Sequence, residues 1–267
     1  MISKHRSVLP AAALLLAISA TGNANPTPQQ EVQRADRFEA RIYKTTRGPE
    51  IPFRLLVPWN YDRLQSWPLV IMLHGSGERG TDNKAQLKND GSVLASDENR
   101  EKFPSFVLVP QCPDKFSWSS IKFANGGIQV LPEESPVEAN LLKVIADIRK
   151  EFNIDSKRLY ITGLSLGGFG TWDILSRYPD MFAAAAPVCG GGDPTKAVRF
   201  AKVPIWAWHG EVDGTVNLEM SKKMIEALKA AGGDPKLTIV PNVGHDSWWT
   251  AYESPELWDW MFKQIKK

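Results

Sequence analysis

Cysteine is scarce in this chain of 267 residues, which holds only Cys112 and Cys189. So few cysteines exclude a small fold held together by disulfides. An excess of one charge is lacking too, because the formal net charge is +2 and includes Lys4 and Arg6. The remainder is close to neutral and lacks the basic footprint of a nucleic-acid-binding protein, so we expect no nucleic-acid partner. Internal repeats and low-complexity tracts are also missing.

Long apolar runs are confined to the start of the chain. The stretch from Val8 to Ala17 is too short to span a bilayer as a helix. It follows three basic residues at 4–6 and precedes the small residues Gly22-Asn23-Ala24, which is the pattern of a signal peptide. We therefore expect a signal peptide at 1–24, a flexible leader at 25–36, and one domain at 37–267. The protein should be secreted or periplasmic, with no membrane span.

One segment predicts a nucleophile. An apolar run from Leu159 to Thr162 leads into Gly163-Leu164-Ser165-Leu166-Gly167. A strand that ends in Gly-x-Ser-x-Gly is typical of a sharp turn into a helix, which leaves the serine hydroxyl exposed at the bend. A side chain two residues to either side of the serine would clash with a neighbouring strand or helix, so glycine is needed there. The alternative is a glycine-rich turn without chemistry.

A serine hydroxyl attacks an acyl carbon only if a base takes its proton, so a histidine is required. His5 falls in the predicted signal peptide. His74 and His209 each end an apolar run and precede glycine, which favours structural roles at strand ends. His245 lies instead in a loop just past the apolar run 237–240, and such a loop can carry an imidazole to a neighbouring strand end. We expect His245 to be the base.

The base needs an acidic partner that holds its tautomer. Asp213 follows the apolar run 203–208 and is the best candidate. Glu211 is the nearest rival, and either could instead cap a turn or helix. Asp246 is too close in sequence to His245 to reach its ring. The order Ser165, Asp213, His245 is that of the α/β-hydrolases and not that of the chymotrypsin or subtilisin arrangements.

The pattern of elements predicts an α/β fold. Apolar strands are expected at 38–43, 53–57, 69–73, 106–109, 159–162, 183–188, 203–208 and 237–240, and helices at 136–152, 166–177, 218–231 and 255–266. Uninterrupted apolar strands that alternate with helices indicate a mostly parallel sheet covered on both faces. Reactive groups then gather at the carboxyl ends of the strands.

Several blocks together resemble the α/β-hydrolase superfamily, and within it the secreted serine esterases related to polyhydroxybutyrate depolymerases and feruloyl esterases. The resemblance covers nearly all of the chain after the leader. The blocks are Leu73-His74-Gly75-Ser76-Gly77-Glu78-Arg79-Gly80, Val109-Pro110-Gln111-Cys112-Pro113, Gly163 to Gly168, Pro187-Val188-Cys189-Gly190-Gly191-Gly192, His209-Gly210-Glu211-Val212-Asp213 and Gly244-His245-Asp246-Ser247-Trp248. It implies an eight-stranded α/β-hydrolase fold.

The resemblance also implies an oxyanion hole built from two backbone N–H groups, those of Ser76 and Leu166. Preorganised amides suit charge that appears only in the tetrahedral intermediate. Many relatives carry methionine or glutamine where Leu166 stands, but a backbone donor is unaffected by that difference. In this fold Cys112 and Cys189 would end strands three spacings apart, which exceeds disulfide reach unless loops fold inward. Whether they form a disulfide is left open. No metal motif or cofactor motif is found.

Only residues 189–202 separate the sixth predicted strand from the seventh, so we expect no cap domain over the site. Trp118 and Trp248 are placed near the open cleft as candidate substrate-binding residues, because an indole offers a flat apolar surface with one donor. Packing in the core is the alternative for each.

The predicted enzyme is a secreted serine carboxylesterase that acts through an acyl-enzyme on short or aromatic acyl esters, small or linked to a polysaccharide or polymer. The alternatives are a serine peptidase of the prolyl-oligopeptidase type and a non-catalytic binding module on the same fold. Acyl and alcohol specificity and oligomeric state cannot be predicted from residue types.

Overall fold

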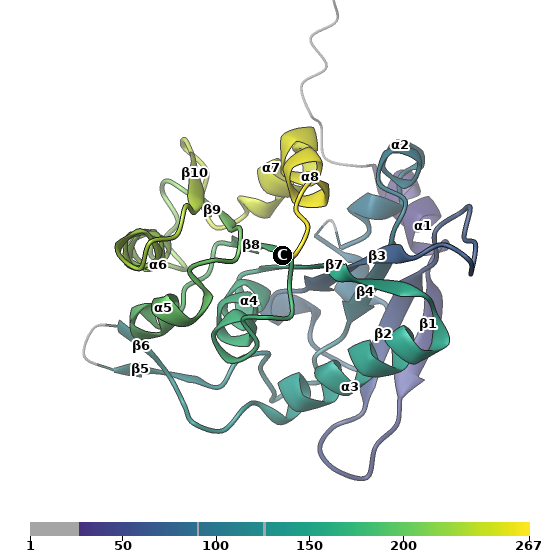
Figure 1. Cartoon of the computed structure of the whole chain (residues 1–267), viewed down its shortest axis with the longest axis horizontal. Coiled ribbons are helices and arrows are strands. Elements are labelled where there is room, and N and C mark those ends of the chain that lie inside the picture. The colour runs from purple at the N-terminus through teal and green to yellow at the C-terminus, as the bar shows by residue number, and fades with distance from the viewer. Residues whose placement is uncertain (1–26, 90, 125–126) are drawn as a thin grey trace, which may run out of the picture.

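The computed structural model describes residues 27–89, 91–124 and 127–267. The predicted signal peptide, with His5, lies outside these residues. Within them the main sheet has eight strands in the order β1-β2-β4-β3-β7-β8-β9-β10 (Figure 1). Antiparallel pairing joins β1 to β2 and β2 to β4, and every other neighbouring pair is parallel. This is the mostly parallel sheet that the sequence predicted.

The strands and helices follow the apolar pattern closely. The strands of the main sheet are β1 Glu39–Tyr43, β2 Ile51–Leu56, β3 Trp67–Leu73, β4 Phe106–Pro110, β7 Ile154–Leu164, β8 Ala184–Val188, β9 Trp206–Gly210 and β10 Lys236–Val240. The α-helices are α1 Pro28–Ala35, α2 Asp97–Lys102, α3 Pro136–Glu151, α4 Leu166–Arg177, α5 Ala197–Phe200, α6 Glu219–Ala230, α7 Trp248–Glu253 and α8 Pro255–Phe262.

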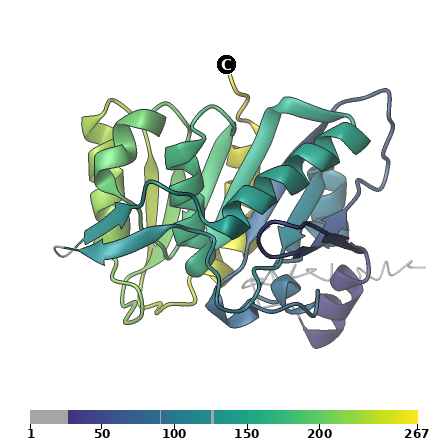
Figure 2. The ribbon, with the colours of Figure 1, turned by 90° about the horizontal axis from the view of Figure 1, so that it is seen from below.

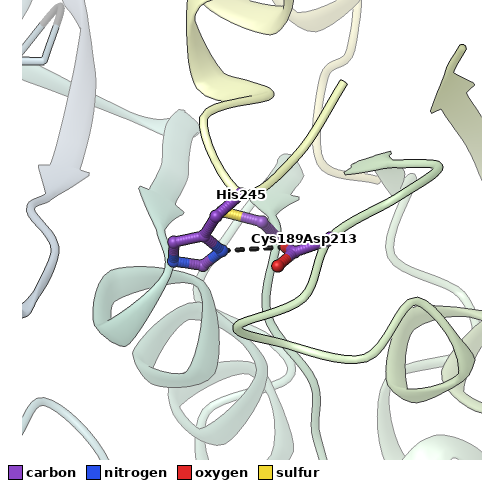
Figure 3. A group of neighbouring side chains, drawn as sticks. All are labelled: Cys189, Asp213 and His245. Atoms are coloured by element: carbon purple, nitrogen blue, oxygen red, sulfur yellow. Dashed lines mark hydrogen bonds and ion pairs between the residues drawn. The ribbon is translucent and has the colours of Figure 1, made fainter. Parts of the chain in front are cut away.

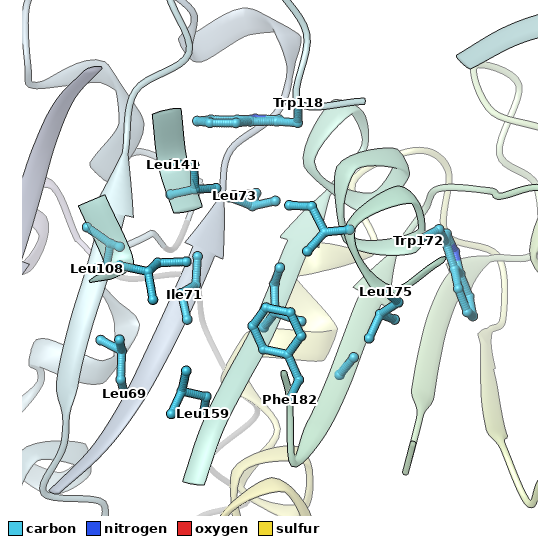
Figure 4. Close-up of a cluster of buried hydrophobic side chains, with 14 of the residues drawn as sticks. Leu69, Ile71, Leu73, Leu108, Trp118, Leu141, Leu159, Trp172, Leu175 and Phe182 are labelled. Atoms are coloured by element: carbon cyan, nitrogen blue, oxygen red, sulfur yellow. The ribbon is translucent and has the colours of Figure 1, made fainter. Parts of the chain in front are cut away.

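Both faces of the sheet are covered because successive side chains of a strand point to opposite sides. Leu69, Ile71 and Leu73 of β3 join one hydrophobic core with α3, α4 and α6 (Figure 4). Val70 and Met72 of the same strand join a second core with α7 and α8. Figure 2 shows α3 on one side of the sheet and the yellow C-terminal helices on the other. No helix in the described ranges is long and apolar enough to cross a bilayer.

Two segments differ from the sequence prediction. Residues 28–35 of the expected flexible leader form α1, which begins with a capping box between Thr27 and Gln30. An antiparallel hairpin, β5 Ile121–Ala124 and β6 Gly127–Val130, stands outside the main sheet. The predicted absence of a cap between β8 and β9 agrees with the structure, because residues 189–205 hold only a short 3-10 turn and α5. The hairpin is therefore the main structural addition beside the strand ends.

A buried acid on α3 gives the fold a pH-dependent stability. Glu138 is fully buried. Burial, and then the nearby Asp173 carboxylate, raise its pKa to about 8, although Arg177 Nε lies 3.5 Å from Glu138 Oε2. An unfolded glutamic acid titrates near its ordinary value of about 4.3. Between these two pH values the native state holds a proton that the unfolded state has lost, so stability falls as pH rises through this window.

We expect Glu138→Gln to raise the free energy of unfolding at pH 9 by an amount on the order of a few kcal/mol, because the amide mimics the neutral acid without the cost of ionisation. At pH 4, where both states of the natural chain are protonated, the two proteins should be nearly equal in stability. Urea unfolding at the two pH values measures this. A difference that does not change with pH would contradict the assignment.

Candidate active site

The predicted nucleophile lies at a strained turn between β7 and α4. Ser165 has φ 51° and ψ −114°, a conformation that residues other than glycine rarely adopt. A Cβ at Gly163 would lie 2.4 Å from the Gly167 carbonyl oxygen, and one at Gly167 would lie 2.0 Å from that of Leu73. The need for glycine on both sides of the serine is thus confirmed. The turn is held by Ser165 N–H, which donates to Val188 O at 3.0 Å.

The structure brings Ser165, His245 and Asp213 together from three separate strand ends. Ser165 Oγ and His245 Nε2 are 2.8 Å apart, and His245 Nδ1 and Asp213 Oδ2 are 2.8 Å apart. Asp213 follows β9, and His245 lies between β10 and α7. The loops that carry them are joined by Val212 N–H, which donates to Val243 O at 3.1 Å. The arrangement can move a proton from a hydroxyl to an imidazole and hold the resulting cation against a carboxylate.

The Asp213 carboxylate is held in place from several directions. Its Oδ1 accepts the backbone N–H groups of Thr215 at 2.8 Å and Val216 at 2.9 Å. Burial opposes its ionisation, but the hydrogen bonds from His245, Val216 and Thr215 outweigh burial and lower the pKa of Asp213 below its ordinary value. The rival Glu211 instead accepts the N–H of Asn242 at 3.0 Å, away from the His245 ring.

The two backbone amides that the family resemblance implies as oxyanion donors are those of Leu166 and Ser76. Leu166 is the first residue of α4, so its N–H has no acceptor within the helix and points from the positive end of the helix dipole. A Cβ at Gly75 would lie 3.6 Å from Ser165 Cβ, so the loop that carries Ser76 passes next to the nucleophile. Neither amide has an intramolecular acceptor within the described part of the chain. Both amides are therefore available to an oxygen in the site.

Trp118 does not line the site, and the expectation that it binds substrate is wrong. The side chain is fully buried. Its Nε1–H donates to the carbonyl of His74 at 3.0 Å, and the two rings meet edge to face with centroids 5.1 Å apart. Burial lowers the pKa of His74 to about 4, so its ring is neutral and accepts Cys112 N–H at 2.9 Å. Trp118 and His74 together fix the start of the loop that carries Ser76.

Trp248 does lie beside the predicted base. Its ring meets the His245 ring edge to face with centroids 5.5 Å apart, and it is partly exposed. Its Nε1 is buried and has no hydrogen-bond partner among the residues that the structure describes. The indole therefore limits how the imidazole can rotate, and its use as a substrate contact stays a prediction.

A cavity of about 390 Å³ lies where the β5–β6 hairpin faces the start of α6. Phe123 and Ile128 of the hairpin and Met220 of α6 give it an apolar lining, and Lys223 adds a cation. Gly192, which follows Cys189 by three residues, also lines it, but Ser165, Asp213 and His245 do not. The sequence offered no signal for this cavity, because the hairpin that forms one wall was not predicted.

The two cysteines are both free and both buried. This answers the question of a disulfide that the sequence left open. Burial raises the pKa of the Cys112 thiol to about 12 and raises that of Cys189 further, so neither is a nucleophile at neutral pH. Cys189, Asp213 and His245 offer three ligand atoms within 4.8 Å of one another (Figure 3). The His245 and Asp213 atoms are already hydrogen-bonded to each other, which favours proton transfer over metal binding.

The sequence did not predict that His209 contacts Asp213. The sequence predicted a structural residue at a strand end, and the ring is fully buried as that role requires. Its Nε2, however, lies 3.3 Å from Asp213 Oδ2, the oxygen that also meets His245. The motif His-Gly-Glu-Val-Asp at 209–213 was the available signal, because it places histidine and aspartate four residues apart across one turn.

Comparison with known proteins finds similarity to hydrolases, most of them named as esterases. Residues 128–252 match the model of the dienelactone hydrolase family. The chain is 37% identical over 178 residues to the bifunctional acetylxylan esterase/xylanase XynS20E of Neocallimastix patriciarum, covering 66% of this chain and 23% of that protein. It is 34% identical over 131 residues to poly(3-hydroxyalkanoate) depolymerase C of Paucimonas lemoignei, covering 46% of this chain and 28% of that protein.

A solved structure is similar to this chain over most of its length. The crystal structure of a thermostable esterase has a TM-score of 0.80 and 39% identity, covering 86% of this chain and 64% of that one. The chain spans only about a quarter of the length of the two curated relatives. With its sheet order, its strained serine and these matches, the chain has the α/β-hydrolase fold and is similar to esterases.

Proposed function

We propose that this protein is a serine carboxylesterase, with residues 37–267 as its catalytic domain. The observation that carries the proposal is the continuous hydrogen-bond chain from Ser165 Oγ through His245 to Asp213, with 2.8 Å at each step. The backbone N–H groups of Ser76 and Leu166, for which the described residues provide no backbone acceptor, are the proposed oxyanion donors that complete the set of groups that acyl transfer needs. The similarity to proteins named as esterases supports the choice of ester substrates.

In the first half of the reaction, Ser165 Oγ attacks the ester carbonyl carbon while His245 Nε2 takes the hydroxyl proton. The carbonyl oxygen becomes an oxyanion, which accepts hydrogen bonds from the amides of Ser76 and Leu166. Asp213 stabilises the imidazolium through His245 Nδ1–H. His245 then gives its proton to the leaving alcohol, and the acyl group remains on Ser165 as an ester.

In the second half, water attacks the acyl carbon and His245 again acts as the base. The acid leaves, and the proton returns to Ser165 Oγ. Because His245 must face Ser165 with an unprotonated Nε2, the ring needs its proton on Nδ1, and the Asp213 contact selects that tautomer.

The apolar cavity between the β5–β6 hairpin and α6 supports a substrate with an apolar or aromatic part. Phe123 exposes about two thirds of its surface there, at 66%, which gives a flat face for an acyl ring or an aliphatic chain. With no cap between β8 and β9, an ester carried by a polysaccharide or other polymer could reach Ser165. We propose secretion on the basis of the residues at 1–24.

The experiment that tests the function is a panel of acetate, butyrate, octanoate and feruloyl esters on small and polysaccharide carriers, run beside peptide nitroanilides. The esterase proposal expects turnover of at least one ester and little turnover of the anilides. Preferred cleavage of the anilides would support a peptidase in its place.

The rate of ester hydrolysis is expected to fall on the acid side of neutrality, because His245 must be neutral to accept a proton. The pKa of Asp213 is lowered, so its carboxylate stays ionised near neutral pH. Its protonation therefore adds no second decrease to the pH–rate profile there. A plot of log kcat/KM against pH should rise with a slope of one on the acid side and then level off. A profile that stays flat down to pH 4 would exclude His245 as the base.

A further inference from the structure

His209 is a fully buried imidazole that the proposed reaction does not use. It lies on β9, and its ring fills the space between the Asp213 loop and α6. Nε2 is 2.9 Å from Val216 O and 3.3 Å from Asp213 Oδ2. Nδ1 is 2.8 Å from Ser221 Oγ, which in turn is 2.9 Å from Gly190 O. One ring therefore connects the acid loop, α6 and the segment that follows β8.

The positions of these oxygen atoms determine where the His209 proton sits. Nε2 faces a carbonyl and a carboxylate, both of which only accept hydrogen bonds. A bare nitrogen there would place three lone pairs against one another in a buried site, so Nε2 carries the proton. The Ser221 hydroxyl has a single hydrogen, which can go either to Gly190 O at 2.9 Å or to Nδ1 at 2.8 Å; in a neutral ring with Nε2–H it goes to Nδ1. Burial, the largest effect, lowers the pKa of His209 and keeps the ring neutral despite the nearby carboxylate.

His209 adds a side-chain tie to the Asp213 loop, beside the backbone bonds from Glu211 N–H to Val240 O and from Val212 N–H to Val243 O. The loop residues Val212 and Thr215 are exposed, and the two amides on Oδ1 belong to the loop itself. They fix the carboxylate relative to the loop but not relative to the sheet. His209 is part of β9, which pairs with β10 along Lys236–Val240. Its Nε2 is within hydrogen-bond distance of Val216 O at 2.9 Å and lies 3.3 Å from Asp213 Oδ2, and so the ring ties the loop to the sheet.

We propose that His209 is a positioning residue for the proposed ester hydrolysis: it donates Nε2–H to Asp213 Oδ2 and holds that oxygen in line with His245 Nδ1. The expected effect on kcat rests on the proposed function, whereas the hydrogen bond itself does not. Oδ2 then accepts one N–H from each of two imidazoles, and Oδ1 accepts two backbone amides. The titratable groups that act on the His209 ring are Asp213 and His245.

The first experiment compares His209→Phe, which keeps a planar ring but has no donor, with His209→Gln, whose amide N–H can reach the same carboxylate. We expect kcat to fall about 10- to 100-fold in His209→Phe, the range for a lost hydrogen bond to a charged group, while KM changes little. His209→Gln should recover most of kcat. Equal losses in both variants, or no loss in His209→Phe, would overturn the proposal.

The second experiment needs no activity. In the unmodified protein labelled with ¹⁵N-histidine, NMR should find the His209 ring neutral at pH 7 with its proton on Nε2. A ring with Nε2 bare would overturn the proposal even if esters are hydrolysed. A protein that shows the Nε2–H ring but hydrolyses no ester would instead reject the proposed function. This measurement also decides the matter if His209→Phe does not fold.

Discussion

Replacing Ser165 with alanine is expected to lower kcat for ester hydrolysis by about 10⁴- to 10⁶-fold, because the proposed covalent intermediate can no longer form. What remains should come from the Ser76 and Leu166 amides acting on a bound ester. Alanine also has to adopt the strained φ of 51°, so the circular dichroism spectrum and melting temperature must be compared with those of the natural chain. The measurement is the initial rate on the best ester of the panel.

Ser66→Ala is a matched control, because Ser66 is an exposed serine just before β3, at the opposite end of that strand from Ser76. Its rate should equal that of the natural chain. If Ser165→Ala folds normally and loses less than about tenfold in kcat, another group must be the nucleophile, and the two-step reaction is wrong.

Replacing Asp213 with asparagine is expected to lower kcat by about 10⁴-fold with little change in structure. Oδ1 of Asp213 accepts two backbone N–H groups, so the asparagine carbonyl should occupy that place and turn its NH₂ toward His245. Nδ1 must then accept a hydrogen bond, and the ring proton moves to Nε2. An imidazole with its proton on Nε2 cannot take the proton of Ser165.

The matched control for this variant is Glu211→Gln, which removes the other carboxylate of the same loop. Glu211 contacts the Asn242 N–H and not the His245 ring, so kcat should change by no more than a few fold. A large loss in Glu211→Gln with a small loss in Asp213→Asn would reverse the assignment of the acid.

Much of the site could be predicted because its chemistry dictates local sequence. Gly163 and Gly167 are required by close backbone contacts, so the serine turn is visible in the letters alone. The apolar runs of β3, β4 and β8 are buried along their whole length, which makes such strands easy to recognise. The fold class therefore follows from continuous apolar runs that alternate with helices.

The errors arise where tertiary contacts decide. Trp118 lies in the segment between β4 and β5. Only the folded chain shows that its ring turns inward to meet His74. The β5–β6 hairpin has exposed residues at Lys122 and Phe123, so it lacks the apolar run of a core strand. Helix α1 has no buried residue, but its capping box at Thr27 was a readable signal that the prediction of a flexible leader overlooked.

Covalent labelling with a fluorophosphonate is the most direct test that Ser165 is a nucleophile activated by His245. Intact-protein mass spectrometry should show one added phosphonyl group on the natural chain, with peptide mapping placing it on the segment that contains Ser165. Labelling should disappear in Ser165→Ala and slow strongly in Asp213→Asn. Undiminished labelling of Ser165→Ala, or no labelling of the active natural chain, would contradict the account.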